Sequence, residues 1–115
     1  MCHALIVEDN LIISRAIQDR LTSAGFDSFD HAWTEDQAVA AAASRSPSLV
    51  VMGDSLEAGT VLNAARRISM QGDVAILMVT ADRSRMRKEL PDDIAIDGPF
   101  PLNEIENVVA LARPG

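Results

Sequence analysis

Residues 49–52 (LVVM) form an apolar run in which no polar residue alternates with the apolar ones. Pro47 precedes this run, and Gly53 and Asp54 follow it. A run this short, bounded by residues that break regular structure, is typical of a strand buried on both faces inside a parallel sheet. In open α/β sheets, ligands and reactive groups gather beyond the carboxyl ends of the strands. The sequence therefore places Gly53 and Asp54 where a functional site is expected.

The rest of the chain alternates predicted strands with predicted helices. Further strands are expected at residues 3–7, 26–32, 74–79 and 94–96. Helices are expected after the N-cap Asn10, before Pro47 behind the capping pair Thr34 and Gln37, and at residues 59–70, 82–90 and 102–112. This alternation predicts a three-layer, doubly wound α/β fold with helices on both faces of a five-stranded parallel sheet. We expect a single domain over residues 1–115.

Composition excludes several classes of function. Seventeen acidic residues against ten basic ones give a net charge of -7, which argues against nucleic acid as the main partner. Cys2 is the only cysteine, so no disulfide can form within the chain and a reducing cytoplasm fits. The first predicted strand begins at residue 3, which leaves no room for a signal peptide, and the apolar runs are too short to span a membrane. We therefore expect a cytoplasmic protein with no membrane partner.

Several segments, taken in order, resemble the receiver domains of two-component response regulators. They are residues 4–10 (ALIVEDN), Gly25 with Phe26, the spacing of Ala32 and Ala38, residues 47–56, residues 76–81 (ILMVTA) and residues 98–100 (GPF). The resemblance covers nearly the whole chain. It implies a flavodoxin-like (βα)5 fold with strand order 2-1-3-4-5.

The resemblance also implies a chemistry, the transfer of a phosphoryl group onto an aspartate. The family holds Mg²⁺ with an acidic pair and meets the phosphoryl oxygens with a hydroxyl and a lysine, which neutralise the charge on those oxygens. Glu8 and Asp9 match the acidic pair, and such hard oxygen ligands suit Mg²⁺. Thr80 matches the hydroxyl.

Three other family positions do not match. The position of the phosphoacceptor aspartate is Gly53, and the position of the lysine is Gly98. The aromatic residue that the family carries on strand five falls on Ala95, and Lys88 is the only lysine in the chain. We therefore expect a degenerate receiver that is not an enzyme and requires no cofactor, with at most weak Mg²⁺ binding at Glu8 and Asp9.

Two alternatives remain open. Asp54 could act as a shifted phosphoacceptor with Mg²⁺, although alternation along a strand points its side chain away from the space that position 53 faces. A one-residue bulge at Gly53 would turn Asp54 inward. The second alternative is a small-ligand-binding or hydrolase domain on the same fold, against which the sequence shows no Gly-rich phosphate loop and no evident pair of nucleophile and base.

A receiver without its phosphoacceptor acts through protein contacts. By resemblance, the contact face comprises the fourth helix, the strand containing Ala95 and the start of the fifth helix. Its residues are Arg83, Arg85, Arg87, Lys88, Asn103, Glu104 and Glu106. The expected partner is a histidine kinase, a phosphotransferase or an effector, and a homodimer through the same face is an alternative. The basic run at residues 83–88 can also be read as a solvated helix face.

Overall fold

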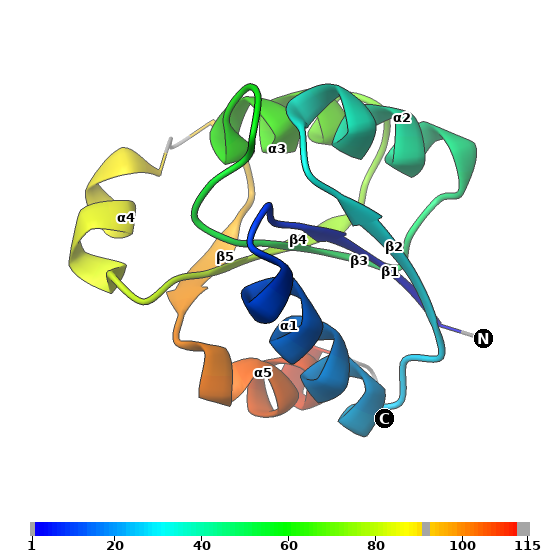
Figure 1. Cartoon of the computed structure of the whole chain (residues 1–115), viewed down its shortest axis with the longest axis vertical. Coiled ribbons are helices and arrows are strands. Elements are labelled where there is room, and N and C mark those ends of the chain that lie inside the picture. The colour runs from blue at the N-terminus through cyan, green and yellow to red at the C-terminus, as the bar shows by residue number, and fades with distance from the viewer. Residues whose placement is uncertain (1, 91–92, 113–115) are drawn as a thin grey trace.

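The structure is a computed structural model that describes residues 2–90 and 93–112, without the side chains of Arg83, Glu89, Leu111 and Ala112. Five parallel strands form one sheet in the order β2-β1-β3-β4-β5 (Figure 1). The strands are β1 (His3–Val7), β2 (Ser28–Ala32), β3 (Leu49–Met52), β4 (Ala75–Val79) and β5 (Asp97–Phe100). The predicted fold class and strand order are confirmed.

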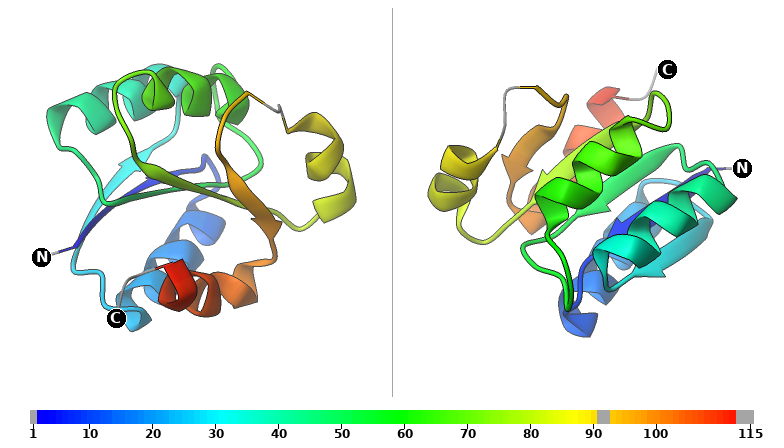
Figure 2. Two further views of the ribbon diagram at one scale, coloured as in Figure 1. Left: turned by 180° about the vertical axis from the view of Figure 1, so that it is seen from behind. Right: turned by 90° about the horizontal axis from the view of Figure 1, so that it is seen from above.

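Helices cover both faces of the sheet. They are α1 (Leu11–Ser23), α2 (Glu35–Ser44), α3 (Val61–Ser69), α4 (Arg83–Glu89), the 3₁₀ turn η1 (Leu102–Glu104) and α5 (Ile105–Ala112). Helices α2 and α3 lie side by side on one face, and α1 and α5 lie on the other (Figures 1 and 2). Helix α4 stands at the edge of the sheet beside β5. No helix in the described part of the chain has the length and apolar character needed to cross a membrane.

Alternation along the strands divides the core into two aliphatic clusters. In β1, Ala4 and Ile6 pack with Ile17 of α1 on one face, whereas Leu5 and Val7 pack on the face that α2 and α3 cover. All five residues of β1 are buried, as expected for a central strand of a parallel sheet.

Side-chain caps hold four helices at their first turns, and the caps at Asn10 and Thr34 were predicted. Asn10 accepts hydrogen bonds from the backbone N–H groups of Ile12 and Ile13. Three further caps join Thr34 to the N–H of Gln37, Thr60 to that of Asn63 and Asp82 to that of Arg85. These bonds satisfy amides that have no partner inside a helix.

Several predicted boundaries are wrong, and one error affects the site. The predicted strand at residues 94–96 lies in a loop where Ala95 is exposed, and the strand follows at Asp97–Phe100. The apolar residues 94–96 suggested a strand at that place. The observed strand β5 contains Pro99 instead, which is tolerated because β5 lies at the edge of the sheet. Strand β2 begins at Ser28 rather than residue 26, α3 covers fewer residues than 59–70, and a 3₁₀ turn precedes α5.

Candidate functional site

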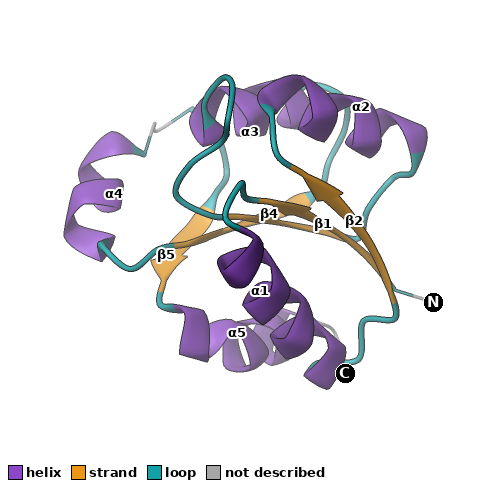
Figure 3. Ribbon diagram, in the orientation of Figure 1, coloured by secondary structure: helices purple, strands orange, loops and turns teal. Residues whose placement is uncertain are grey.

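The predicted site lies at the carboxyl edge of the sheet, where the loops after β1, β3, β4 and β5 meet (Figure 3). Glu8 directly follows β1 and Gly53 directly follows β3. These two central strands are neighbours, and the N–H of Gly53 donates to the carbonyl of Val7 at 2.9 Å. The fold thus brings the acidic pair beside the phosphoacceptor position, as the resemblance implied.

The Glu8 carboxyl group occupies the space above Gly53. Glu8 is 3% exposed, its Oε1 accepts the N–H of Asp54 at 3.0 Å, and its Oε2 accepts the N–H of Asn10 at 2.9 Å. A Cβ atom built on Gly53 would lie 1.9 Å from Oε1 and 2.7 Å from Cδ of Glu8. The volume into which a side chain at position 53 would project is therefore filled by the side chain of Glu8.

This burial gives Glu8 a distinctive response to pH. Loss of solvent raises its pKa above the ordinary 4.5, and the neighbouring Asp9 raises it further, against the lowering effect of the two backbone N–H donors. Between 4.5 and the raised value, the folded protein binds more protons than the unfolded chain, so stability falls as pH rises through that window. We expect urea unfolding of the wild type to show this fall and Glu8→Gln to lose it.

The exposed Glu104 supplies the control for the pH experiment. Glu104→Gln should leave the slope of unfolding free energy against pH as it is in the wild type. An unchanged slope in Glu8→Gln would show that the Glu8 carboxyl is not the group that titrates in this window.

The carboxylates of the acidic pair accept hydrogen bonds within the protein. Both oxygens of Glu8 accept backbone N–H groups, and Asp9 Oδ1 accepts the hydroxyl of Ser55 at 2.9 Å. No group of three His, Cys, Asp or Glu residues within residues 2–90 and 93–112 is arranged to hold a metal ion. Each Glu8 oxygen accepts only one N–H group and only one Asp9 oxygen is engaged, so weak Mg²⁺ binding at Glu8 and Asp9 stays a prediction.

The residues at the hydroxyl and lysine positions, Thr80 and Gly98, also have structural roles. Thr80 is 4% exposed, and its Oγ1 accepts the N–H of Asp82 at 3.0 Å, one residue before α4 begins. Gly98 has a φ of 119°, and a Cβ atom on it would lie 2.7 Å from the carbonyl oxygen of Met78. A side chain of any kind is strained at position 98, so a lysine stem does not fit this backbone.

Asp54 follows Gly53 after the end of β3, and alternation along an extended chain is expected to point its side chain away from the space that position 53 faces. Strand β3 pairs regularly with β1 and β4 through Met52, and Gly53 continues that hydrogen bonding, so the described strands show no bulge that would turn Asp54 inward. Asp54 borders two hollows, one between the loop after β3, helix α3 and Met86 of α4, and one beside Val79, Thr80 and Leu102. Its Oδ1 is buried and has no hydrogen-bond partner among the described residues.

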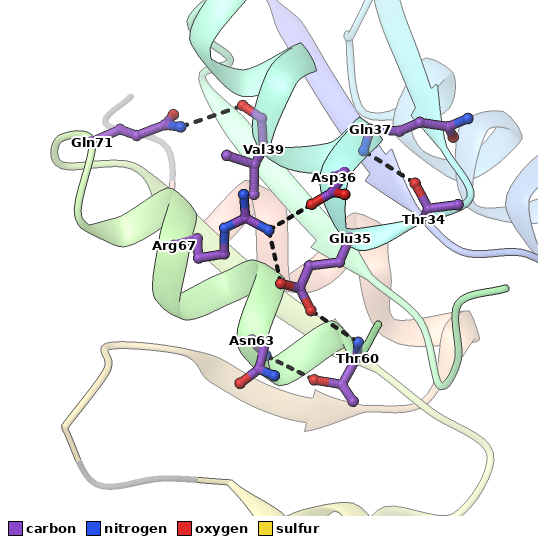
Figure 4. Close-up of polar contacts among 9 residues, drawn as sticks. All are labelled: Thr34, Glu35, Asp36, Gln37, Val39, Thr60, Asn63, Arg67 and Gln71. Carbon is purple, nitrogen blue, oxygen red and sulfur yellow. Dashed lines mark hydrogen bonds and ion pairs between the residues drawn. The ribbon is translucent and has the colours of Figure 1, made fainter. Parts of the chain in front are cut away.

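Hydrogen bonds to Trp33, which follows β2, and to the start of α2 hold the loop that carries Asp54. The N–H of Glu57 donates to Trp33 at 2.9 Å, and the N–H of Glu35 donates to Ala58 at 2.9 Å. Glu35 Oε1 also accepts the N–H of Thr60 at 3.2 Å (Figure 4). The loop is therefore tied to the start of α2 along most of its length.

Arg67 extends this network from α3 to α2. Its Nη1 donates to Glu35 and to Asp36, each at 2.8 Å (Figure 4). These bonds lower the pKa of the Glu35 carboxyl. The sequence analysis did not identify this network, because its members are about thirty residues apart and belong to no motif.

Two serine–histidine hydrogen bonds, which the sequence analysis did not identify, join neighbouring elements. Ser14 Oγ lies 2.6 Å from His31 Nδ1, and Ser28 Oγ lies 2.8 Å from His3 Nδ1. Ser14 is only 2% exposed, and burial lowers the pKa of His31. Both pairs join neighbouring elements, α1 to β2 and β1 to β2, and Ser28 also accepts a bond from Arg45 at 2.7 Å. Their geometry indicates cross-links between elements.

The predicted contact face is only partly assembled. Arg85, Arg87 and Lys88 are exposed on α4, and Asn103 and Glu104 are exposed in η1, whereas the Arg83 side chain lies outside the description. Glu106 instead accepts a hydrogen bond from Arg20 of α1 at 2.9 Å. Glu106 therefore helps to join α5 to α1. Ala95, which was predicted to lie on a strand of this face, lies in the loop before β5.

Several solved structures with the same architecture are receiver domains. The receiver domain of the response regulator PhyR from Erythrobacter litoralis is 28% identical, with a TM-score of 0.78 over 96% of this chain and 88% of that one. A CheY-like receiver domain from Methylobacillus flagellatus is 19% identical, with a TM-score of 0.78 over 98% of this chain and 99% of the other. No protein-family model and no curated protein sequence matches the chain.

A longer protein contains the same architecture as one part. PhyR from Brucella abortus is 22% identical, with a TM-score of 0.78 over 96% of this chain but only 46% of its own length. This likeness concerns the fold alone.

Proposed function

The chain has the fold of response-regulator receiver domains, and from this premise we propose that it is a signalling module that works through protein contacts without phosphorylation. The observation that carries the proposal is the Glu8 carboxyl group in the space above Gly53. A side chain that could accept a phosphoryl group is missing there, and the space for one is filled. The strained backbone at Gly98 further disfavours the family's lysine.

The contact surface that we propose is centred on α4. The side chains of Arg85, Arg87 and Lys88 are exposed on α4. They place positive charge on this helix, whereas the chain as a whole has a net charge of -7. An acidic segment of a protein partner is complementary to this surface. The PhyR of Bartonella quintana is described as an anti-anti-sigma factor, a precedent on this fold for a protein that acts on another protein. We place the module in the cytoplasm, and self-association through α4 is the alternative arrangement.

Intact mass spectrometry after incubation with acetyl phosphate and Mg²⁺ tests the proposal. We expect no gain of about 80 Da, the mass of a phosphoryl group, because Gly53 has no reactive side chain and Glu8 fills the space around it. A receiver that retains the acceptor aspartate, treated in parallel, shows that the reagents are active.

The variant Asp54→Ala distinguishes the shifted-acceptor alternative. A stable adduct in the wild type that disappears in Asp54→Ala would establish Asp54 as a phosphoacceptor and overturn the proposal. An adduct that persists in Asp54→Ala would overturn it as well, since another side chain would then be accepting the phosphoryl group.

A further inference from the structure

We propose that the hollow between helix α1 and the end of β2 binds a free aromatic amino acid. This hollow has a volume of about 450 Å³, within the range of small-molecule sites in proteins. It is lined by residues of the first half of α1, by His31 of β2 and by Trp33, which directly follows β2. The inference goes beyond the proposed function and does not rest on it.

The aromatic ring of the ligand follows from Trp33. Its side chain is 42% exposed, whereas tryptophan is highly buried on average. The backbone of Trp33 is held on both sides, because its N–H donates to Gln37 Oε1 at 2.9 Å and its carbonyl accepts the N–H of Glu57 at 2.9 Å. An exposed indole on a fixed backbone offers the flat ring of a ligand a stacking partner.

A second accessible apolar side chain lines the same hollow. Leu11, the first residue of α1, is 67% exposed. A ring placed in the hollow would remove apolar surface of both Leu11 and Trp33 from water, which favours binding. The two residues that provide the apolar surface are therefore open to a ligand.

Two opposite charges border the hollow from one helix. Arg15 and Asp19 both line it, both are exposed, and they are one turn of α1 apart. None of the ion pairs among the described residues includes either side chain. A lone carboxylate would be repelled by Asp19 and a lone ammonium by Arg15. A zwitterion, whose carboxylate and ammonium groups are adjacent, can meet both.

His31 adds no charge to this arrangement. Its Nδ1 lies 2.6 Å from Ser14 Oγ, and its Nε2 lies 2.6 Å from Gln18 Oε1. Burial lowers the pKa of His31 below its ordinary 6.5, so the ring is uncharged at neutral pH. Since both ring nitrogens are engaged within the protein, a metal ion is disfavoured, and the charges left to a ligand are those of Arg15 and Asp19.

The pair of charges favours a free amino acid over a segment of a protein. Within a peptide chain, amide bonds replace the ammonium and the carboxylate of each residue. An aromatic side chain of a protein partner would therefore bring the ring without the two charges that Arg15 and Asp19 match.

The fluorescence of Trp33 provides a direct test. Trp33 is the only tryptophan and the chain has no tyrosine, so tryptophan emission reports on this hollow alone. L-Phenylalanine carries the ring and both charges without absorbing where tryptophan is excited. Phenylpropionate lacks the ammonium group, phenylethylamine lacks the carboxylate, and L-alanine lacks the ring. We expect L-phenylalanine to bind more tightly than each of these three, and to shift backbone amides at residues 11–19 and 31–33.

Variants at the two charges complete the design. Arg15→Gln should weaken L-phenylalanine binding by about fivefold, the size of an exposed ion pair, and should not weaken binding of phenylethylamine. Asp19→Asn should have a similar effect on L-phenylalanine and should not weaken binding of phenylpropionate. Asp27→Asn, on an exposed residue at the opposite end of the sheet, should leave binding unchanged. All three positions are exposed, so we expect these variants to fold.

Four results would overturn the inference. They are unchanged emission and amide shifts with L-phenylalanine up to its solubility limit, equal binding of the ligands that lack one charge, and wild-type affinity in both Arg15→Gln and Asp19→Asn. The fourth is tighter binding of N-acetyl-L-phenylalaninamide, which has the ring without the charges and would assign the hollow to a segment of a protein. None of these depends on phosphorylation, so the inference and the proposed function can fail separately.

Discussion

Gly53→Ala is expected to lower the free energy of unfolding by about 2–3 kcal/mol, although the change adds only a methyl group to a residue that continues a buried strand. The new Cβ would lie 1.9 Å from Glu8 Oε1, so the carboxyl group must shift. We expect this shift to break its hydrogen bonds to the N–H groups of Asp54 and Asn10. Urea denaturation of the wild type and the variant measures the loss.

A double-mutant cycle with Glu8→Ala isolates the cause. Once the carboxyl group is removed, the same substitution at Gly53 should change stability by less than about 0.5 kcal/mol, which gives a coupling of about 2 kcal/mol. A parallel cycle with Glu104→Ala, on an exposed carboxylate outside the site, should show no coupling. If Gly53→Ala were neutral in every background, the Glu8 side chain would not be held above Gly53.

Met86→Ala is the second substitution with a large expected effect. Met86 is 1% exposed and packs against the α2 and α3 side of the core. It is the one fully buried residue among the described side chains of α4. Removal of its side chain should cost about 2–3 kcal/mol and should loosen the helix that carries Arg85, Arg87 and Lys88.

Met70 provides a matched control, since the same side chain is 81% exposed there. Met70→Ala should change stability by less than about 0.5 kcal/mol. Hydrogen exchange should become faster in α4 for Met86→Ala and stay unchanged in α4 for Met70→Ala. Unchanged exchange in α4 of the Met86 variant would mean that other contacts anchor this helix.

Strong local patterns explain why most of the fold could be predicted. The apolar runs at residues 49–52 and 74–79 are typical of strands inside a parallel sheet, and the capping residues Asn10 and Thr34 mark where helices begin. The fifth strand was misplaced because the apolar residues 94–96 mimic a strand. The observed β5 contains glycine and proline, which are poor strand residues in general and tolerated at an edge.

Through its resemblance to receiver domains, the sequence alone placed glycines at the positions of the phosphoacceptor and the lysine. It also determined the order of the elements, since periodicity is a local property of the chain. Only the tertiary structure decided what happens around those glycines. Glu8 and Gly53 are 45 residues apart in sequence, and only the pairing of β1 with β3 brings the carboxyl group into the vacant space. The buried oxygen of Asp54 likewise arises from packing, because hydrogen-bond satisfaction depends on neighbours that sequence spacing does not reveal.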